Sequence, residues 1–338
     1  MTPALHIVRP GLLTTVQDLG RIGYQSLGIA VCGALDPVAL RAANALAGNP
    51  PAAGALEVLH VGPTIAIEAD DARLAFAGAN AAIEILPDSS AVRGRRVETM
   101  RSIRLRRGEI IRVGALSAGA VLYVAVEGGF DITPMLGSVS TDMRAGFGGW
   151  QGRALGEGDR LPLRLEHAAE RDECRIEGLD LTAPTTVRAI PGPQDDYFAE
   201  SEIAALFDTL YTVGAGSNRM GMRLEGRPIA HARGHNITSD AIAPGSIQIP
   251  GNGQPIVLLA DRQTTGGYPK IATVISADVP AFGRLTIGAK IRFMPVSLEE
   301  ARRHRRAWLA DMDRIPEKIV PIGARDAAAN AIASTERV

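Results

Sequence analysis

Residues 255–275 read PIVLLADRQTTGGYPKIATVI, a dense polar segment between two apolar runs. The runs at 255–260 and 271–275 have the pattern of buried strands. The segment between them carries charged, amide, hydroxyl and phenol groups: Asp261, Arg262, Gln263, Thr264, Thr265, Tyr268 and Lys270. Because polar groups are costly to bury without partners, this concentration favours a functional site on a rigid β frame. The simpler alternative is a self-contained hairpin whose turn is capped by the two threonines.

The use of lysine singles out one residue of this segment. The chain has 36 lysines and arginines together, but its only lysines are Lys270, Lys290 and Lys318. Arginine therefore supplies most of the solvated positive charge. An ammonium can change its protonation state where a guanidinium cannot, so a lysine in the polar segment favours a chemical role. The alternative is that this lysine is there by chance.

The composition limits the class of protein. A chain of 338 residues, 46% hydrophobic and 22% charged, is globular and long enough for two domains. Its net charge of −1 offers no electrostatic basis for binding nucleic acid or an anionic membrane. The sequence shows no transmembrane run, no signal peptide and no disulfide framework. We therefore expect a cytoplasmic protein with no nucleic-acid or membrane partner.

Short apolar runs separated by turns dominate residues 55–165. Their spacing, near the roughly 8–12 residues typical of sandwiches and barrels, predicts an all-β unit. The runs lie at 56–61, 64–68, 73–77, 82–86, 102–105, 110–113 and 120–126. Further strands are expected at 5–8, 14–16, 186–190 and 211–213. The glycine-rich segment 127–153 has little periodicity and is expected to be a functional or mobile loop.

Three helices and a domain boundary complete the predicted organisation. Asp36 as N-cap and Pro37 at the first helical position predict a helix through 38–46. Apolar spacing predicts a second helix at 198–210 and an amphipathic, partner-facing third at 297–318. A shift to charged residues between 165 and 186 marks the boundary. We expect a first domain at 1–180, a second at 181–296, and a C-terminal helix with a frayed tail at 297–338.

Polar clusters near other predicted strand ends are candidates to complete the site. Gln194, Gln248 and Gln263 carry neutral amides that suit an amide-like ligand, although turn residues of this type need no ligand. Arg219 can clamp a carboxylate or simply pair with Asp240. The remaining candidates for substrate binding are Gln17, Asp18, Tyr24, Ser217, Asn218, Ser239, Asp240, Thr264, Thr265 and Tyr268.

Three residues are expected to carry the chemistry. Lys270 or Arg219 can stabilise negative charge that develops on an amide oxygen. Asp261 can orient the cation or act as a base, unless it is a buried partner of Arg262 or Lys270.

Several familiar motifs are absent. The chain has no GxxxxGK[ST] phosphate loop, no GxGxxG dinucleotide motif, no HExxH, no CxxC and no GxSxG. His231 and His235 are four residues apart, but Gly234 between them favours a strand or loop over a helix that would align them. We therefore expect no metal site.

A series of motifs resembles the KipA-like family, also known as the 5-oxoprolinase C subunit, allophanate hydrolase subunit 2 or the biotin-dependent carboxyltransferase A/B domain. The motifs run in order over roughly residues 5–296: TTVQDLGR, the AANALAGN helix, VEGGFD, PGPQDDYF, SNRMGMRLEG, PGSIQIPG and the opening stretch. A small departure is CGALD at 32–36, where the family usually has GGAMD.

The resemblance implies a mainly β fold made of two cyclophilin-like β-barrel domains with a few short helices. It implies a subunit of a prokaryotic ATP-dependent 5-oxoprolinase, which converts 5-oxo-L-proline to L-glutamate. The implied partners are a KipI-like B subunit and a LamB/YcsF-like A subunit, and the implied substrate is a small amide or lactam. ATP would bind at a site shared with a partner protein or on that partner.

The same resemblance allows two other functions. One is the carboxyltransferase component of a biotin-dependent urea carboxylase or allophanate hydrolase system. No lysine of this chain is flanked by methionines as in a biotin-accepting site, so biotin would arrive on another polypeptide. The other is a non-catalytic regulator that binds a KipI-like kinase inhibitor.

Overall fold

The computed structural model describes residues 2–86 and 94–323, which form two compact units. Unit 1 consists of Met1–Gly20, Pro37–Leu181 and Asp313–Val338, and unit 2 of Arg21–Asp36 and Thr182–Met312. The division expected from composition, at 1–180, 181–296 and 297–338, is linear along the chain. The units instead exchange segments, because packing between distant residues decides which unit a segment joins. The expected frayed tail lies outside the described residues.

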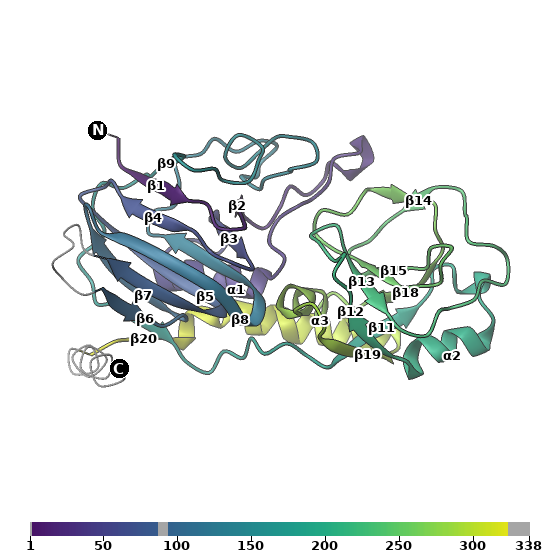
Figure 1. The fold of residues 1–338 in the computed structure, drawn as a ribbon. Helices are drawn as coiled ribbons and strands as arrows, with labels where there is room; N and C mark the ends of the chain where they lie inside the picture. Colours follow the sequence, from purple (N-terminus) through teal and green to yellow (C-terminus); the bar gives the residue numbers. More distant parts are fainter. Residues whose placement is uncertain (1, 87–93, 324–338) are drawn as a thin grey trace. The chain divides into compact units, whose positions relative to one another are not determined.

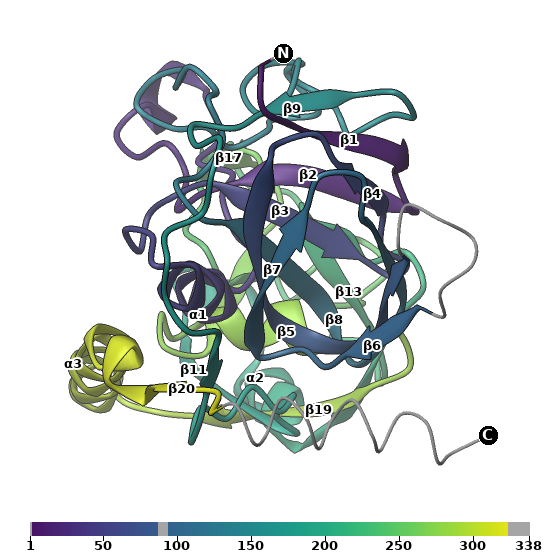
Figure 2. The ribbon, with the colours of Figure 1, turned by 90° about the vertical axis from the view of Figure 1, so that its left-hand side faces the viewer.

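Unit 1 is built on one large sheet with antiparallel pairing throughout (Figures 1 and 2). Its main path runs β20-β10-β7-β5-β8-β4-β1-β9, while β6 pairs with β5 and β2 joins through β3 to β8. The strands are β1 Ala4–Arg9, β2 Leu13–Gln17, β3 Ala55–Leu59, β4 Thr64–Ile67, β5 Asp71–Leu86, β6 Arg95–Val97, β7 Arg101–Arg106, β8 Ile110–Val126, β9 Arg160–Pro162, β10 Cys174–Ile176 and β20 Ile319–Pro321.

Two strands of this sheet are longer than the sequence pattern indicated. The runs expected at 73–77 and 82–86 belong to the single strand β5, and those at 110–113 and 120–126 to β8. The prediction of four separate strands was therefore wrong. Gly78 adopts a φ of +124° and a Cβ there would lie 2.5 Å from the Val121 carbonyl oxygen. The glycine lets the strand change register beside its neighbour without ending it.

One helix covers the long strands of unit 1. α1 (Pro37–Ala47) starts at the expected proline, and its apolar residues are buried against β5 and β8 (Figure 1). Small alanines on this helix allow it to approach the sheet closely, and Leu40 and Leu46 are fully buried. The core on the opposite side of the same strands is apolar, with Leu74, Phe76, Leu122 and Val124 among its members.

Unit 2 is a closed barrel in the order β11-β18-β15-β16-β13-β12-β19. A parallel pairing of β19 with β11 closes it, whereas the other neighbours are antiparallel. The strands are β11 Thr186–Pro191, β12 Leu210–Val213, β13 Gly221–Glu225, β15 Ser246–Gln248, β16 Ile256–Leu258, β18 Lys270–Val274 and β19 Lys290–Pro295. A separate ladder pairs β14 (Asp240–Ala241) with β17 (Thr265–Gly266). The prediction of a mainly β protein with few helices is confirmed.

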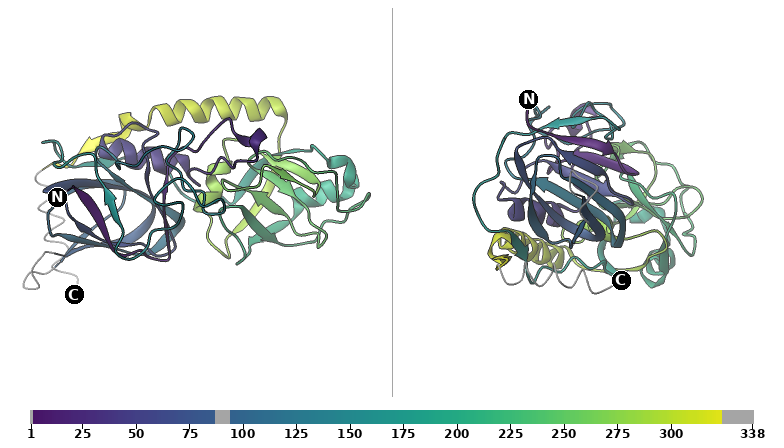
Figure 3. Two further views of the ribbon diagram at one scale, coloured as in Figure 1. Left: turned by 90° about the horizontal axis from the view of Figure 1, so that it is seen from above. Right: turned by 60° about the vertical axis from the view of Figure 1, so that its left-hand side comes forward.

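Two helices and four 3-10 turns complete the described chain. α2 spans Glu200–Asp208, shorter at both ends than expected. α3 (Leu298–Asp313) is one continuous helix that stops before the expected residue 318, because a 3-10 turn with Pro316 near its start follows it (Figure 3). The 3-10 turns are Gln25–Leu27, Asp195–Tyr197, Val279–Arg284 and Ile315–Lys318. Among the described residues, no helix combines the length and apolar character needed to cross a membrane.

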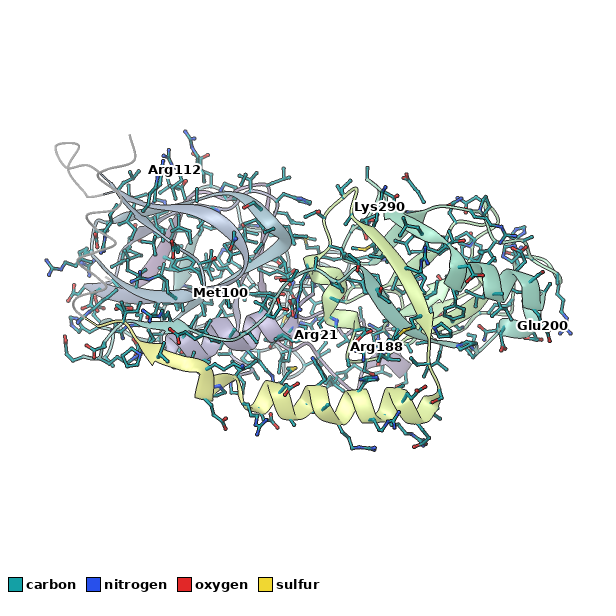
Figure 4. All side chains as sticks on the ribbon, turned by 90° about the horizontal axis from the view of Figure 1, so that it is seen from below. Arg21, Met100, Arg112, Arg188, Glu200 and Lys290 are labelled. Atoms are coloured by element: carbon teal, nitrogen blue, oxygen red, sulfur yellow. The ribbon has the colours of Figure 1, made fainter. Side chains whose placement is uncertain are left out.

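Polar contacts attach α3 within unit 2. Ser297 and Glu300 form a reciprocal capping box at its N-terminus. Arg188 on β11, labelled in Figure 4, donates to both oxygens of Asp278 and lies 2.6 Å from His304 of α3. The arginine therefore joins a barrel strand, a 3-10 turn and the helix.

Candidate functional site

The polar segment after β16 leaves the barrel before it returns as β18. β16 and β18 do not pair with each other; each pairs with β15, which lies between them. Within the excursion, β17 pairs with β14, so Gly266 lies opposite Asp240. The alternative of a self-contained hairpin is therefore wrong. Four segments distant in sequence meet at this end of the barrel: 194, 240–242, 246–248 and 261–270.

Lys270 is a buried cation at the first position of β18. Its side chain is 1% exposed, and its Nζ lies 2.8 Å from Oδ2 of Asp240, whose own side chain is 49% exposed. This contact uses one of the three ammonium donors. The other two have no acceptor among the described residues. Lys270 is therefore held by one carboxylate and can still donate to a ligand.

Asp240 is held as a carboxylate by three groups. The ammonium of Lys270, the N–H of Ala241 and the carboxamide of Gln194 lower the pKa of Asp240, in that order of effect. Gln194 Nε2 donates to Asp240 at 2.9 Å, while its Oε1 accepts from the backbone N–H of Lys270 at 3.1 Å. Gln194 is thus oriented at both ends, and it orients the ion pair in turn.

Two other carboxamides at the site make no hydrogen bond within the described part of the chain. Gln248 lies directly opposite Lys270 in the β15–β18 ladder, and only 2% of the residue is exposed. A Cβ at Gly266 would lie 2.7 Å from Gln248 Nε2 and 3.4 Å from Gln263 Nε2. Glycine at position 266 therefore leaves room for both amides. Gln263 is half-buried, but the enclosed amide nitrogen of Gln248 has no partner, which is costly and indicates a ligand that supplies one.

Arg219 and Asp261 form a separate, closed pair. The guanidinium donates to both carboxylate oxygens of Asp261 at 2.8 Å and to the carbonyl of Gly33 at 2.7 Å. The alternative pairing of Arg219 with Asp240 was wrong, and so were Arg262 and Lys270 as partners of Asp261. Asp261 orients a cation as expected, and of the two expected cations it contacts Arg219. A catalytic role for either residue stays a prediction.

Several predicted substrate-binding side chains are engaged in local turns. Ser217 Oγ donates to the carbonyl of Gly214, and Asn218 Oδ1 accepts from the N–H of Met220, which closes the β12–β13 turn. Thr264 is not in such a turn: its backbone carbonyl accepts from the N–H of Ile242, which is distant in sequence. The three remaining candidates in this region, Ser239, Thr265 and Tyr268, are exposed.

The other expected candidates lie outside the barrel. Tyr24 belongs to the N-terminal segment of unit 2 and precedes a 3-10 turn. Gln17 and Asp18 belong to unit 1. The Asp18 carboxylate accepts from the hydroxyls of Ser138 and Ser140, both at 2.6 Å, and from two backbone N–H groups. This carboxylate holds the 127–153 loop, and its expected convergence with the 261–270 segment stays a prediction.

The histidines show no metal-site arrangement. His231 contacts the carbonyl of Ile249 at 2.9 Å. Across residues 2–86 and 94–323, no three His, Cys, Asp or Glu side chains are grouped so as to hold a metal ion.

The assembled site can bind a neutral amide and stabilise charge on its oxygen. Lys270 offers two free ammonium donors, and the carboxamides of Gln248 and Gln263 can donate to a carbonyl or accept from an amide N–H. Such preorganised donors are worth several kcal/mol when negative charge develops on the ligand. Sequence reasoning missed that Arg262 lies buried without a carboxylate, because adjacent Asp261 was available as an alternative partner for it.

Comparison with known proteins places the chain among carboxyltransferase relatives. The family model "Carboxyltransferase domain, subdomain A and B" matches residues 27–295. The chain is 40% identical over 302 residues to the 5-oxoprolinase C subunit of Escherichia coli, covering 89% of this chain and 94% of that protein. The Haemophilus influenzae protein of the same name is 38% identical, with the same coverage.

More distant similarity extends to larger enzymes. Urea amidolyase of Saccharomyces cerevisiae is 28% identical over 319 residues, which cover 88% of this chain but 17% of that protein. The crystal structure of Kluyveromyces lactis urea carboxylase superposes with a TM-score of 0.81 at 27% identity. This alignment covers 95% of this chain and 31% of that one.

Proposed function

Since this chain belongs to the family of the carboxyltransferase domain, subdomain A and B, we propose that it is the C subunit of an ATP-dependent 5-oxoprolinase. Similarity over 94% of a protein named as the 5-oxoprolinase C subunit supports this choice. The KipA-like resemblance of the sequence is thereby confirmed. In the proposed reaction, the complex opens the lactam of 5-oxo-L-proline to give L-glutamate in the cytoplasm.

The buried ammonium of Lys270 is the observation that carries the proposal. Water addition to the lactam carbonyl places negative charge on its oxygen, and breaking the C–N bond leaves an amine that takes up a proton. The two free donors of Lys270 would stabilise that oxygen, and Asp240 would keep the ammonium in place. The carboxamides of Gln248 and Gln263 would bind the lactam and orient it.

ATP does not fit the described cluster by itself. Its triphosphate needs several cationic or backbone donors, whereas Lys270 is already paired with Asp240 and no phosphate-binding glycine loop of the familiar kind is present. We therefore place ATP on a partner protein or at a surface shared with one. The proposed partners are a KipI-like B subunit and a LamB/YcsF-like A subunit.

A carboxyltransferase function is the second candidate, favoured by the TM-score of 0.81 to a urea carboxylase. Urea also presents an amide, so the carboxamides and Lys270 would suit it as well. Carboxybiotin would then come from another polypeptide, since no lysine here is flanked by methionines. We rank this function second because sequence similarity to urea amidolyases is lower and covers only a small part of those proteins.

Co-expression with the two proposed partners tests the proposal. The purified complex is assayed for ATP hydrolysis that depends on 5-oxoproline and for release of glutamate. In parallel, carboxyl transfer is assayed with urea and a biotinylated carrier. Glutamate release supports the first function and carboxyurea formation the second. A stable complex with a KipI-like protein that lacks both activities would instead favour a regulatory role.

A further inference from the structure

Arg262 is a buried cation without a carboxylate partner among the described residues. Only 5% of the residue is exposed, and its guanidinium donates to the backbone carbonyls of Ile242 and Leu259, both at 3.2 Å. No carboxylate pairs with it anywhere in the described chain. Burial lowers the pKa of Arg262, and the neighbouring Cys32 opposes that shift in part. Two neutral carbonyls only partly replace the water that the guanidinium has lost.

Two other buried arginines of this protein are paired with carboxylates. Arg73, whose side chain is fully buried, is paired with the carboxylates of Glu127 and Glu173. Arg219 is paired in bidentate fashion with Asp261. An unpaired buried charge is far more costly than a paired one, so the lack of a carboxylate at Arg262 needs an explanation.

The outer nitrogen of Arg262 is free to bind a ligand. Nε and Nη1 make the two carbonyl contacts, and Nη2 makes no hydrogen bond with described residues. Nη2 therefore keeps its donors for a small anion, and guanidinium groups bind carboxylates especially well.

Ile242 connects this cation to the amide-binding groups. Its carbonyl accepts from Arg262, and its N–H donates to the carbonyl of Thr264. Its Cδ1 lies 2.7 Å from the position that a Cβ at residue 266 would take. Gln248 Nε2 also lies 2.7 Å from that position. The guanidinium of Arg262 and the unbonded carboxamide of Gln248 thus both lie next to Ile242. A small molecule that carries both an amide and a carboxylate would offer each of them a partner.

We propose that Arg262 binds the carboxylate of the substrate, so that the site selects an anionic lactam over a neutral lactam or urea. The inference rests on the proposed function and deepens it. In 5-oxoproline the carboxylate is attached to the same five-membered ring that contains the lactam amide. Arg262 would bind the carboxylate while Gln248, Gln263 and Lys270 bind the amide.

The test compares 5-oxoproline with 2-pyrrolidinone, the same ring without the carboxylate, in the complete complex. In the wild type we expect 2-pyrrolidinone to inhibit only at concentrations at least about tenfold above the KM for 5-oxoproline. Arg262→Gln should raise that KM by about ten- to a hundredfold, as loss of a charged hydrogen bond does. The kcat and the inhibition constant of 2-pyrrolidinone should change little, because only binding of the carboxylate is lost.

Two further variants separate recognition from structure. Arg262→Lys restores the charge and should recover part of the affinity. Arg223→Gln removes an exposed arginine of the same barrel and should leave both constants unchanged. The proposal is overturned if Arg262→Gln leaves the KM for 5-oxoproline unchanged, weakens both ligands equally, or raises the KM for ATP instead. A wild-type complex with no activity on 5-oxoproline would overturn the proposed function itself, and this inference with it.

Discussion

Replacing Lys270 by methionine tests the proposed chemistry with little change in packing. The side chain is 1% exposed, so an alanine would leave a cavity, whereas methionine has a similar length and volume. The substitution removes the ammonium with its two free donors and releases Asp240. Because the Asp240 side chain is about half exposed, water can solvate its carboxylate after the change. We therefore expect Tm to fall by no more than about 4 °C.

Turnover should fall much more than stability. Loss of one preorganised charge-stabilising group typically lowers kcat by about 10²–10³-fold, or about 3–4 kcal/mol of barrier. The assay is glutamate release by the assembled complex at saturating 5-oxoproline and ATP, with complex formation verified by light scattering. Lys290→Met, on the exposed first position of β19 and labelled in Figure 4, is the matched control and should retain full activity. Near-normal turnover by Lys270→Met would show that the ammonium is structural.

Three more predictions concern the described contacts. Contacts led by the Arg104 guanidinium lower the pKa of Asp71 to about 2. The resulting stability is present above the ordinary, unfolded pKa of 3.8 and is lost as pH falls toward 2. Asp71→Asn should therefore cost about 1 kcal/mol at pH 7, after allowance for solvent around Arg104, and almost nothing near pH 2 in urea titrations. Asp18→Ala breaks four hydrogen bonds to a carboxylate and should destabilise unit 1 by about 3 kcal/mol in the same assay; an unchanged midpoint would contradict this. Gly266→Ala should displace Gln248 and raise the KM for 5-oxoproline about tenfold or more without loss of folding; an unaltered KM would remove Gln248 from the site.

Local sequence patterns predicted the element types well where a strand or helix is regular. The α1 helix was predicted because alanines and leucines repeat after an Asp-Pro start, and the strands of both units because short apolar runs repeat between turns. The pattern failed at β5 and β8, where glycines resemble turns. A glycine in a strand marks a bend or close approach as readily as an end, and only the neighbouring strand decides which.

The candidate site was predicted as a region more reliably than as a set of contacts. The polar segment 261–270 does lie at the barrel end with Gln194, Asp240 and Gln248. The partners of its charged residues were not predictable from order along the chain. Asp261 pairs with Arg219, forty-two residues away, while adjacent Arg262 has no carboxylate among the described residues.

The sequence by itself determined the mainly β class, the family and the location of the polar segment, because composition, periodicity and motif order are properties of neighbouring residues. Only the tertiary structure decided which charges are satisfied. Lys270 and Arg262 are both buried, yet one receives a carboxylate from β14 and the other receives none from the described part of the chain. Ion pairing depends on distances of a few ångströms between segments that the fold brings together. Whether a buried charged residue has a partner of opposite charge can therefore be seen only in the folded structure.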